Sequence, residues 1–283
     1  MHRLLCANFA RMKKTKIFWI GVLVPMIFGI WFLLGAYMQA RGKYEAELPR
    51  IFPEIVFQSV VFGGIVFAAF CGLFTGTEYE DGTIRNKLMV GRSRASIYMT
   101  NFISSVAAAV VQTFVAVAAV LVLGMLLIGK PELELERFLK TCVVLLFVCV
   151  SYVSLWNLFT MLISKKSYAV TINILLAFLL LFAATYLAAR LCEPEMVQGY
   201  QFVDGVMEVG AMEPNPHYIK GMQRSVYQFL LDFLPGGQTY QIANFSMQDA
   251  LLRQPIKFCA YSACIAVVSN AVGVFLFSRK DIK

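Results

Sequence analysis

Residues 76–98 read GTEYEDGTIRNKLMVGRSRASIY and lie between two long apolar runs. The segment carries acids and bases, and two glycines, Gly82 and Gly91, stand on either side of its middle part. Thr83–Val90 has the length of a short helix, and its apolar side chains Ile84 and Leu88 would share one face. The sequence therefore predicts two long helices that are joined by a polar segment with a short helix of its own.

The composition outside this segment places the chain in a membrane. Hydrophobic residues make up 59% of its 283 residues, charged residues only 15%, and the mean hydropathy is +0.69. Soluble domains carry about 25% charged residues, so a chain this apolar needs a lipid environment. Runs of about 20 apolar residues can cross a bilayer as helices. The six such runs are Ile17–Tyr37, Ile55–Thr75, Ser104–Ile128, Thr141–Ile163, Tyr168–Ala189 and Ile256–Ser278.

We therefore expect an all-α integral membrane protein with six transmembrane helices. Backbone groups in lipid must form their hydrogen bonds internally, which a helix does within its own segment. The first run could instead be a cleaved signal peptide, because basic residues precede it. Its apolar stretch is longer than the roughly 7–15 residues of such a peptide, so we expect it to remain as the first span.

The distribution of charge predicts the orientation. Bases are dense in four segments, which are 1–16, 76–97, 164–167 and the tail from Arg279. Most acids lie in three longer segments, which are 38–54, 129–140 and 190–255. Since basic segments stay on the cytoplasmic side, we expect both termini in the cytoplasm and residues 190–255 on the outer side of the cell membrane. The net charge of +8 then reflects topology and lipid contact, and no nucleic-acid binding is expected.

The domain organisation follows from these spans. Residues 1–16 are expected to form an amphipathic helix in the inner interface, with Leu5, Phe9 and Met12 on its apolar face. Its bases, Arg3, Arg11 and Lys14, would contact lipid headgroups; a disordered start is the alternative. Residues 17–189 would hold the first five spans, with the cytoplasmic loop 76–97 between the second and the third. Residues 256–283 would form the last span and a cytoplasmic tail.

Residues 190–255 are too long for a simple connection, and we expect a helical extracytoplasmic segment. The apolar residues of Tyr218–Leu234 fall on one face, which predicts an amphipathic helix at the outer interface or dipping into it. Pro235-Gly236-Gly237 would end this helix. Ser246 would then cap a further short helix.

The polar residues of the spans are amides: Gln112, Asn157, Asn173 and Asn270. Ion-coupled transporters usually need charged groups in the membrane, so the absence of charges argues against an ion pump. The amides could line a transport pathway, or they could form hydrogen bonds between helices, as such residues more often do. Gly64, Ala68, Gly72 and Gly76 recur every four residues and would let a neighbouring helix approach closely, in either a mobile or a static contact.

No motif for catalysis or metal binding is found. His2 and His217 are too few for a metal cluster, and Gly124–Lys130 matches a phosphate-binding loop only until Pro131, where Ser or Thr would hold Mg²⁺. We therefore expect that the chain is not an enzyme and holds no metal or cofactor. If it transports anything, the energy must enter from a partner. On physical grounds the segment 76–97 suits either a docking helix or an anchored, solvated loop.

The segment and the overall layout resemble the type-2 ABC transporter permeases. The residues of the segment that carry the resemblance are Glu78, Gly82, Thr83, Ile84, Leu88, Gly91, Ser93, Arg94, Ile97 and Tyr98. The basic amphipathic start, the six spans, the large segment before the last span and the stretch Phe233–Gln238 are also similar. The chain looks most like small bacterial subunits for peptide export or for self-protection against peptide antibiotics.

The resemblance implies the permease subunit of an ABC exporter for an amphiphilic substrate, a peptide or a lipid-like compound. Its implied partners are membrane lipid, a second permease subunit in a homodimer or heterodimer, and two ATPase subunits that carry ATP and Mg²⁺. The implied coupling residues are Glu78, Asp81, Gly82, Thr83, Ile84, Arg85, Lys87 and Leu88, with Lys165 and Lys166 as a second contact.

Specific roles follow for some of these residues. We expect Ile84 and Leu88 to point into a groove of the ATPase, Asp81 or Thr83 to cap the short helix, and Glu78 to pair with a base or cap a helix. The main alternative is a non-transporting immunity or sensor protein that binds a peptide antibiotic through residues 190–255. An intramembrane hydrolase is a weaker alternative.

Overall fold

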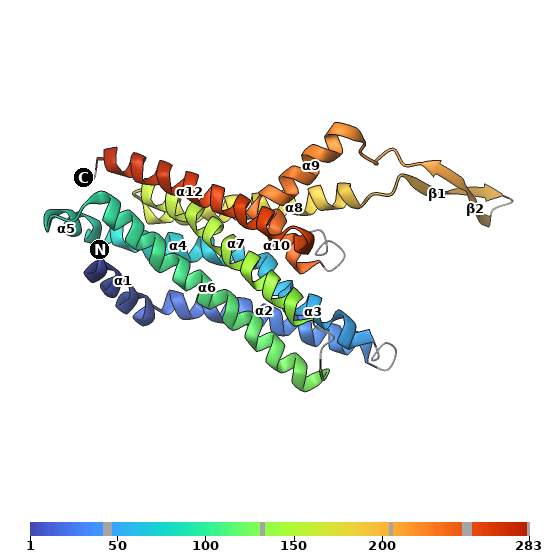
Figure 1. Cartoon of the computed structure of the whole chain (residues 1–283), viewed down its shortest axis with the longest axis horizontal. Coiled ribbons are helices and arrows are strands. Elements are labelled where there is room, and N and C mark those ends of the chain that lie inside the picture. The colour runs from blue at the N-terminus through green and yellow to red at the C-terminus, as the bar shows by residue number, and fades with distance from the viewer. Residues whose placement is uncertain (42–46, 131–133, 204–205, 245–250, 282–283) are drawn as a thin grey trace.

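The computed structural model is a bundle of long helices and describes residues 1–41, 47–130, 134–203, 206–244 and 251–281 (Figure 1). Within these ranges, six helical stretches are long and apolar enough to cross a membrane, which confirms the predicted spans. They are α2 (Lys16–Ala40), the stretch Leu48–Glu80, α6 (Arg94–Leu127), α7 (Leu135–Leu162), α8 (Lys166–Cys192) and α12 (Pro255–Arg279).

The second span is broken, which the sequence analysis did not predict. It consists of α3 (Leu48–Gln58), a 3₁₀ turn, η2 (Ser59–Phe62), and α4 (Gly63–Glu80). Two glycines follow the turn, and a glycine pair is a frequent cause of a break because it weakens the helix. Gly64 is also needed for packing, since a Cβ there would lie 2.7 Å from a ring carbon of Tyr152 on α7.

Both termini lie at the end of the bundle that carries α5 (Thr83–Met89), as Figure 1 shows. The N-terminal helix, α1 (His2–Lys14), runs along this end and packs on α6. The described residues are thus arranged as the predicted topology requires, with residues 76–97 on the same side as both termini. That this side faces the cytoplasm stays a prediction.

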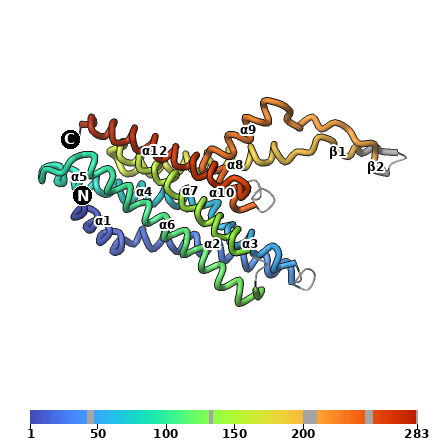
Figure 2. Tube along the Cα trace, viewed as in Figure 1, coloured from blue at the N-terminus to red at the C-terminus, as the bar shows by residue number. Residues whose placement is uncertain are grey.

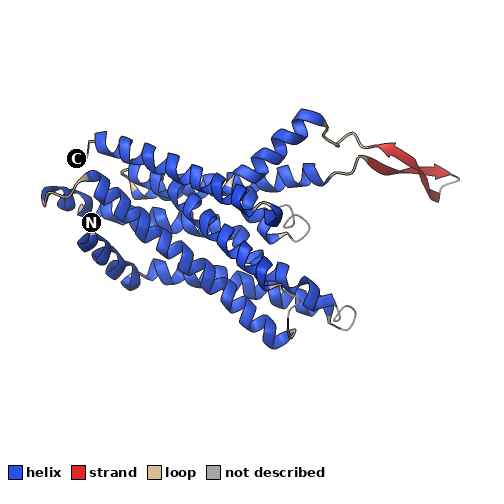
Figure 3. Ribbon diagram, viewed as in Figure 1, coloured by secondary structure: helices blue, strands red, loops and turns tan. Residues whose placement is uncertain are grey.

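The segment before the last span differs from the wholly helical form that we expected. A β-hairpin of β1 (Met196–Val203) and β2 (Val206–Pro214) projects from the far end of the bundle (Figure 3). The chain leaves α8 through this hairpin and returns through α9 (Gly221–Phe233), as the trace in Figure 2 shows. The predicted helix at 218–234 is confirmed in α9. The predicted cap at Ser246 lies outside the described residues.

Pro235 does not only end α9; it also begins a new helix, α10 (Pro235–Ala243), which is almost wholly buried. This helix dips into the bundle and packs on α7, α8, α9 and η2. Its two glycines allow the approach, since a Cβ at Gly236 would lie 2.5 Å from the Leu180 carbonyl oxygen and one at Gly237 only 2.0 Å from that of Leu231. The expectation that the helices of this segment lie at the outer interface or dip into it stays a prediction, and α10 shows that part of the segment inserts between the helices of the bundle.

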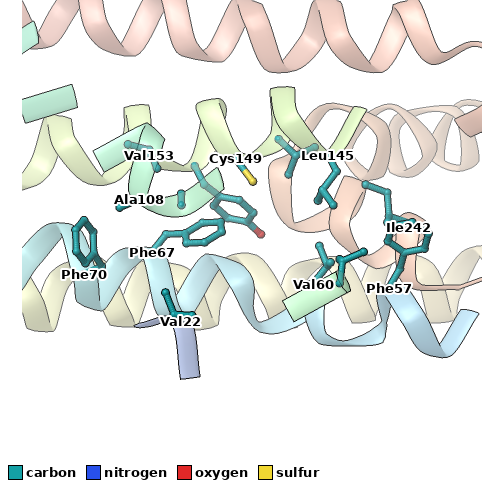
Figure 4. Close-up of a cluster of buried hydrophobic side chains, with 14 of the residues drawn as sticks. Val22, Phe57, Val60, Phe67, Phe70, Ala108, Leu145, Cys149, Val153 and Ile242 are labelled. Carbon is teal, nitrogen blue, oxygen red and sulfur yellow. The ribbon is translucent and has the colours of Figure 1, made fainter. Parts of the chain in front are cut away.

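The main hydrophobic core joins the spans to α10 (Figure 4). Phe67 of α4 lies between Val22 of α2 and Cys149 of α7, with Phe70 to one side, and Ile242 of α10 joins the cluster from the other end. The small residues of α4 extend this packing to α8, where a Cβ at Gly72 would lie 2.9 Å from the Val170 Cα atom. The structure therefore shows the glycine stripe as a tight helix contact.

Candidate coupling site

The short helix α5 owes its shape to the glycines that flank it. Gly82 (φ 64°) and Gly91 (φ 82°) both adopt the left-handed conformation, which other residues enter only at a cost. Gly82 itself is the N-cap residue of α5, with no hydrogen bond from a capping side chain, so the predicted cap by Asp81 or Thr83 is wrong. The next helix, α6, is capped by the Ser93 hydroxyl, which accepts from the Ser96 N–H at 3.3 Å.

Glu78 is a buried carboxylate at the end of α4, with only 1% of its side chain exposed. Its Oε1 lies 2.9 Å from an Arg11 guanidinium nitrogen of α1 and 2.6 Å from Lys87 Nζ of α5. Its Oε2 accepts a hydrogen bond of 2.9 Å from the Asn101 amide of α6. The prediction that Glu78 pairs with a base is confirmed, and this one side chain connects helices α1, α4, α5 and α6.

Arg11 is partly buried, with 31% of its side chain exposed, and it pairs with Glu78, a contact that the prediction of bases on lipid headgroups did not include. Its guanidinium packs 4.0 Å from the centre of the Phe74 ring. Burial lowers the pKa of Arg11, and the charges of Glu78 and Asp81 oppose that shift. A buried charge is tolerated only when a partner compensates it, so Arg11 and Glu78 depend on each other.

The face of α1 that packs on the bundle was not predicted. Its buried residues are Leu4, Asn8 and Met12, while Leu5 and Phe9 of the predicted apolar face are partly buried. The Asn8 amide donates to Asn101 Oδ1 at 2.6 Å, and Lys87 Nζ donates to Asn8 Oδ1 at 3.4 Å. The prediction followed apolar spacing alone, whereas this helix rests on α6 partly through a polar residue.

Ile84 does not point toward a partner, because it is 1% exposed within this chain. It packs with Ile97, Tyr98, Met161 and Phe277, and Leu88 lies partly buried against the same cluster. The expectation that both side chains fill a groove of an ATPase is therefore wrong for Ile84. The ends of α6, α7 and α12 supply the apolar surroundings that we had assigned to another protein.

The exposed side chains of α5 are those that follow Ile84 and Leu88 in the sequence. Met89 and Val90 are 69% and 76% exposed, and Arg85 and Asn86 are exposed beside them. We call these four residues the α5 tip. Two apolar side chains that face outward from a helix anchored by its other face form a surface that another protein can cover.

The second predicted contact is partly occupied within the chain. Lys166 Nζ lies 2.9 Å from Glu80 Oε2, which ties the start of α8 to the end of α4. Lys165 is exposed, with its Nζ 5.3 Å from the centre of the Tyr168 ring. Of this pair, Lys165 is the side chain that stays available for a contact with a partner.

The sequence analysis did not predict a set of hydrogen bonds made by Arg94 and Lys280 at the end of α12, which we call the clasp. The Arg94 guanidinium donates to the carbonyl oxygens of Phe277, at 3.1 Å, and Lys280. Lys280 Nζ donates to the Tyr79 hydroxyl at 3.1 Å and to the Met161 carbonyl oxygen at 3.2 Å. Burial lowers the pKa of Lys280 to about 8. These residues fix the C-terminal end of α12 to α4, α6 and α7, directly behind α5.

Of the four amide side chains in the spans, three are buried and that of Asn270 is partly buried. Asn173 of α8 donates to the Thr160 hydroxyl of α7 at 2.8 Å, and Asn270 of α12 donates to the Ser154 hydroxyl of α7 at 3.1 Å. Gln112, Asn157 and Asn173 are fully buried. The structure thus supports the role of Asn173 and Asn270 in joining helices. A pathway lined by the four amides stays a prediction.

A second buried carboxylate, Asp232 of α9, was also missed. It pairs with Lys257 of α12 at 2.8 Å and accepts from the Gln228 amide at 2.8 Å. The sequence places Asp232 among apolar residues of an amphipathic helix, which is a signal that it would need a partner in the fold. Together Glu78 and Asp232 fasten opposite ends of the bundle.

Comparison with known proteins identifies the family of the chain. In the described part of the chain, no group of His, Cys, Asp and Glu residues is arranged to hold a metal ion. No curated protein matches the chain. The sequence model of a family described as "ABC-2 family transporter protein" matches residues 4–190, a range that covers α5 and all but the outermost two residues of α1 and of the fifth span. Since the match covers well over half of the sequence, the chain belongs to the ABC-2 family of transporter proteins.

Proposed function

We propose that this chain is the permease subunit of an ATP-driven exporter and that a separate ATPase acts on it through the α5 tip. Membership of the ABC-2 family makes it a membrane component of a transporter, and such permeases generally work with ATP-binding subunits. Two ATPase subunits, a second permease subunit and an amphiphilic substrate complete the proposal. ATP and Mg²⁺ are assigned to the ATPase.

The observation that carries this proposal is the combination of an exposed tip and a fixed base on α5. The tip presents Met89 and Val90, while Lys87 holds the helix to Glu78 and Ile84 anchors it in the apolar cluster. A push on the tip would therefore move α4 and α6 with it, because Lys87 binds Glu78 of α4 and Ile84 packs against Ile97 and Tyr98 of α6. Through Arg11 the same push would reach α1.

The proposal is tested by placing charges on the tip. Full burial of an apolar side chain contributes roughly 1.5–3 kcal/mol, and a loss of about 1.4 kcal/mol weakens binding tenfold. We expect Met89→Glu with Val90→Glu to weaken retention of the ATPase at least tenfold when the tagged chain is purified from its native membranes. The retained chain must carry a phosphate-binding loop and hydrolyse ATP.

Met222→Glu is the matched control, because this methionine is also exposed but belongs to α9, which lies at the other end of the bundle from α5. It should leave the ATPase bound. An undiminished ATPase in the double variant would contradict the proposal. Absence of any ATPase from the wild-type preparation would instead favour the non-transporting immunity or sensor protein.

A further inference from the structure

A groove of about 480 Å³ lies between α2 and α3, in the half of the bundle away from α5. This volume is within the range of roughly 300–1,000 Å³ that small-molecule sites occupy. Residues from both helices line it, among them Trp31, Phe32, Gln39, Glu54, Ile55 and Gln58. The groove adjoins η2, since Phe62 of that turn stacks on Phe32 with 6.3 Å between ring centres.

The groove is apolar at one end and polar at the other along the direction that crosses the membrane. With a rise of 1.5 Å per residue, Trp31 lies about 22 Å and Gln39 about 35 Å from the start of α2 at Lys16. The hydrocarbon core is about 30 Å thick, so the aromatic end lies within the outer leaflet. The end with Gln39 and Glu54 lies at the level of the headgroups.

Glu54 gives the groove its charge. Its carboxylate lines the groove and is partly buried, and it forms no ion pair within the described ranges. Arg50, one helical turn earlier on α3, is exposed and is not paired with it. A partly buried carboxylate without a counter-charge attracts a cation, and the reduced contact with water strengthens that attraction.

We propose that this groove binds a single-chain cationic amphiphile from the outer leaflet. The cationic head lies against the Glu54 carboxylate, with the Gln39 amide at the same end, and the Gln58 amide lies one helical turn deeper in the groove. The apolar chain runs down the groove along Trp31 and Phe32. The claim that the groove binds such a compound stands independently of the proposed function. The claim that it is the entry site for the exported compound rests on the proposed function.

Trp31 provides a direct readout of binding. The probes are three twelve-carbon chains with a nitroxide at the far end, which differ only in a head group that is an amine, an alcohol or a carboxylate. They are titrated into the purified chain in nanodiscs of neutral phosphatidylcholine. The chain has 3 tryptophans, so the Trp31→Phe variant is measured in parallel and subtracted to isolate the quenching of Trp31.

We expect the amine to quench Trp31 saturably, with a half-saturating concentration at least fivefold below that of the alcohol and further below that of the carboxylate. Glu54→Gln should make the amine and the alcohol equal. Glu47→Gln is the matched control, because it removes an exposed acid from the start of the same helix but outside the groove. It should keep the preference for the amine.

Three results would overturn the proposal: quenching that does not saturate, an unchanged preference in Glu54→Gln, or an equal loss in Glu47→Gln. The first would mean simple partition into lipid, and the last would mean attraction by surface charge alone. If the groove binds the amine but the amine leaves ATP hydrolysis by the assembled complex unchanged, the binding site stands and its role as an entry site is rejected. The ATPase contact at the α5 tip is tested separately.

Discussion

At the scale of single residues, Glu78 and Ile84 show what sequence can and cannot establish. An acid among apolar residues at the edge of a span must find a base, so the pairing of Glu78 was predictable. The sequence gives Ile84 an apolar face but no indication of whether that face meets the chain's own helices or another protein. The face of α1 that packs on α6 could not be read from apolar spacing either, because Asn8 is held there by polar contacts.

Neutralising Glu78 should destabilise the protein. Glu78→Gln leaves Arg11 and Lys87 close together without their carboxylate, and an unpaired buried charged group costs at least about 1–3 kcal/mol. We expect a clear fall in the thermal unfolding midpoint in detergent. Glu80→Gln is the matched control, because its exposed pair with Lys166 is worth only about 0–1 kcal/mol. Equal midpoints for the two variants would refute the structural role of Glu78.

Lys280 should titrate far below an ordinary lysine. Its folded-state pKa is about 8 against an ordinary value of 10.5, because burial disfavours the charged form. Between these values the unfolded chain binds more protons, so the free energy of unfolding should rise with pH from about 8 to 10.5. NMR of ¹³C-methylated lysines should show one resonance, absent in Lys280→Met, with a midpoint near 8. A midpoint above 10 for that resonance would exclude the buried clasp.

At the scale of elements, the six spans could be located from the sequence to within a few residues at most ends, because an apolar run of this length has few structures open to it other than a membrane-spanning helix. The β-hairpin was missed even though Asp204-Gly205 stands between residues of high β propensity, which is a strong hairpin signal. The break in span 2 and the insertion of α10 could not be predicted from a local sequence signal of this kind. Both depend on which helix approaches a glycine, and that is a property of the packed bundle.

The buried position of α10 makes its glycines sensitive to substitution. Gly236→Ala places a Cβ 2.5 Å from the Leu180 carbonyl oxygen, a backbone atom that cannot move without shifting α8. Overpacking of this kind typically costs about 1–3 kcal/mol, so the unfolding midpoint and the yield of folded protein should both fall. Gly35→Ala on α2 has no neighbour within 4 Å and serves as the control. A normal midpoint in Gly236→Ala would mean that α10 is not seated against α8.

At the scale of the whole molecule, two polar clusters fasten opposite ends of the bundle. At one end Glu78 connects α1, α4, α5 and α6, and at the other Asp232 connects α9 to α12. Between them the contacts are mainly apolar or between small residues, as along the α4 stripe. This arrangement suits a protein that receives force at the α5 tip and transmits it through stiff helices to its far end.

The central claim is that an ATPase binds at the α5 tip, and site-specific photocrosslinking measures this contact most directly. The photoreactive residue p-benzoylphenylalanine replaces Met89 in one variant and Met222 in another, and cells producing each variant are irradiated. We predict a crosslinked product from position 89 that contains a chain with an ABC-type phosphate-binding loop, and no such product from position 222. Absence of that chain at position 89, or its equal capture at both positions, would contradict the account.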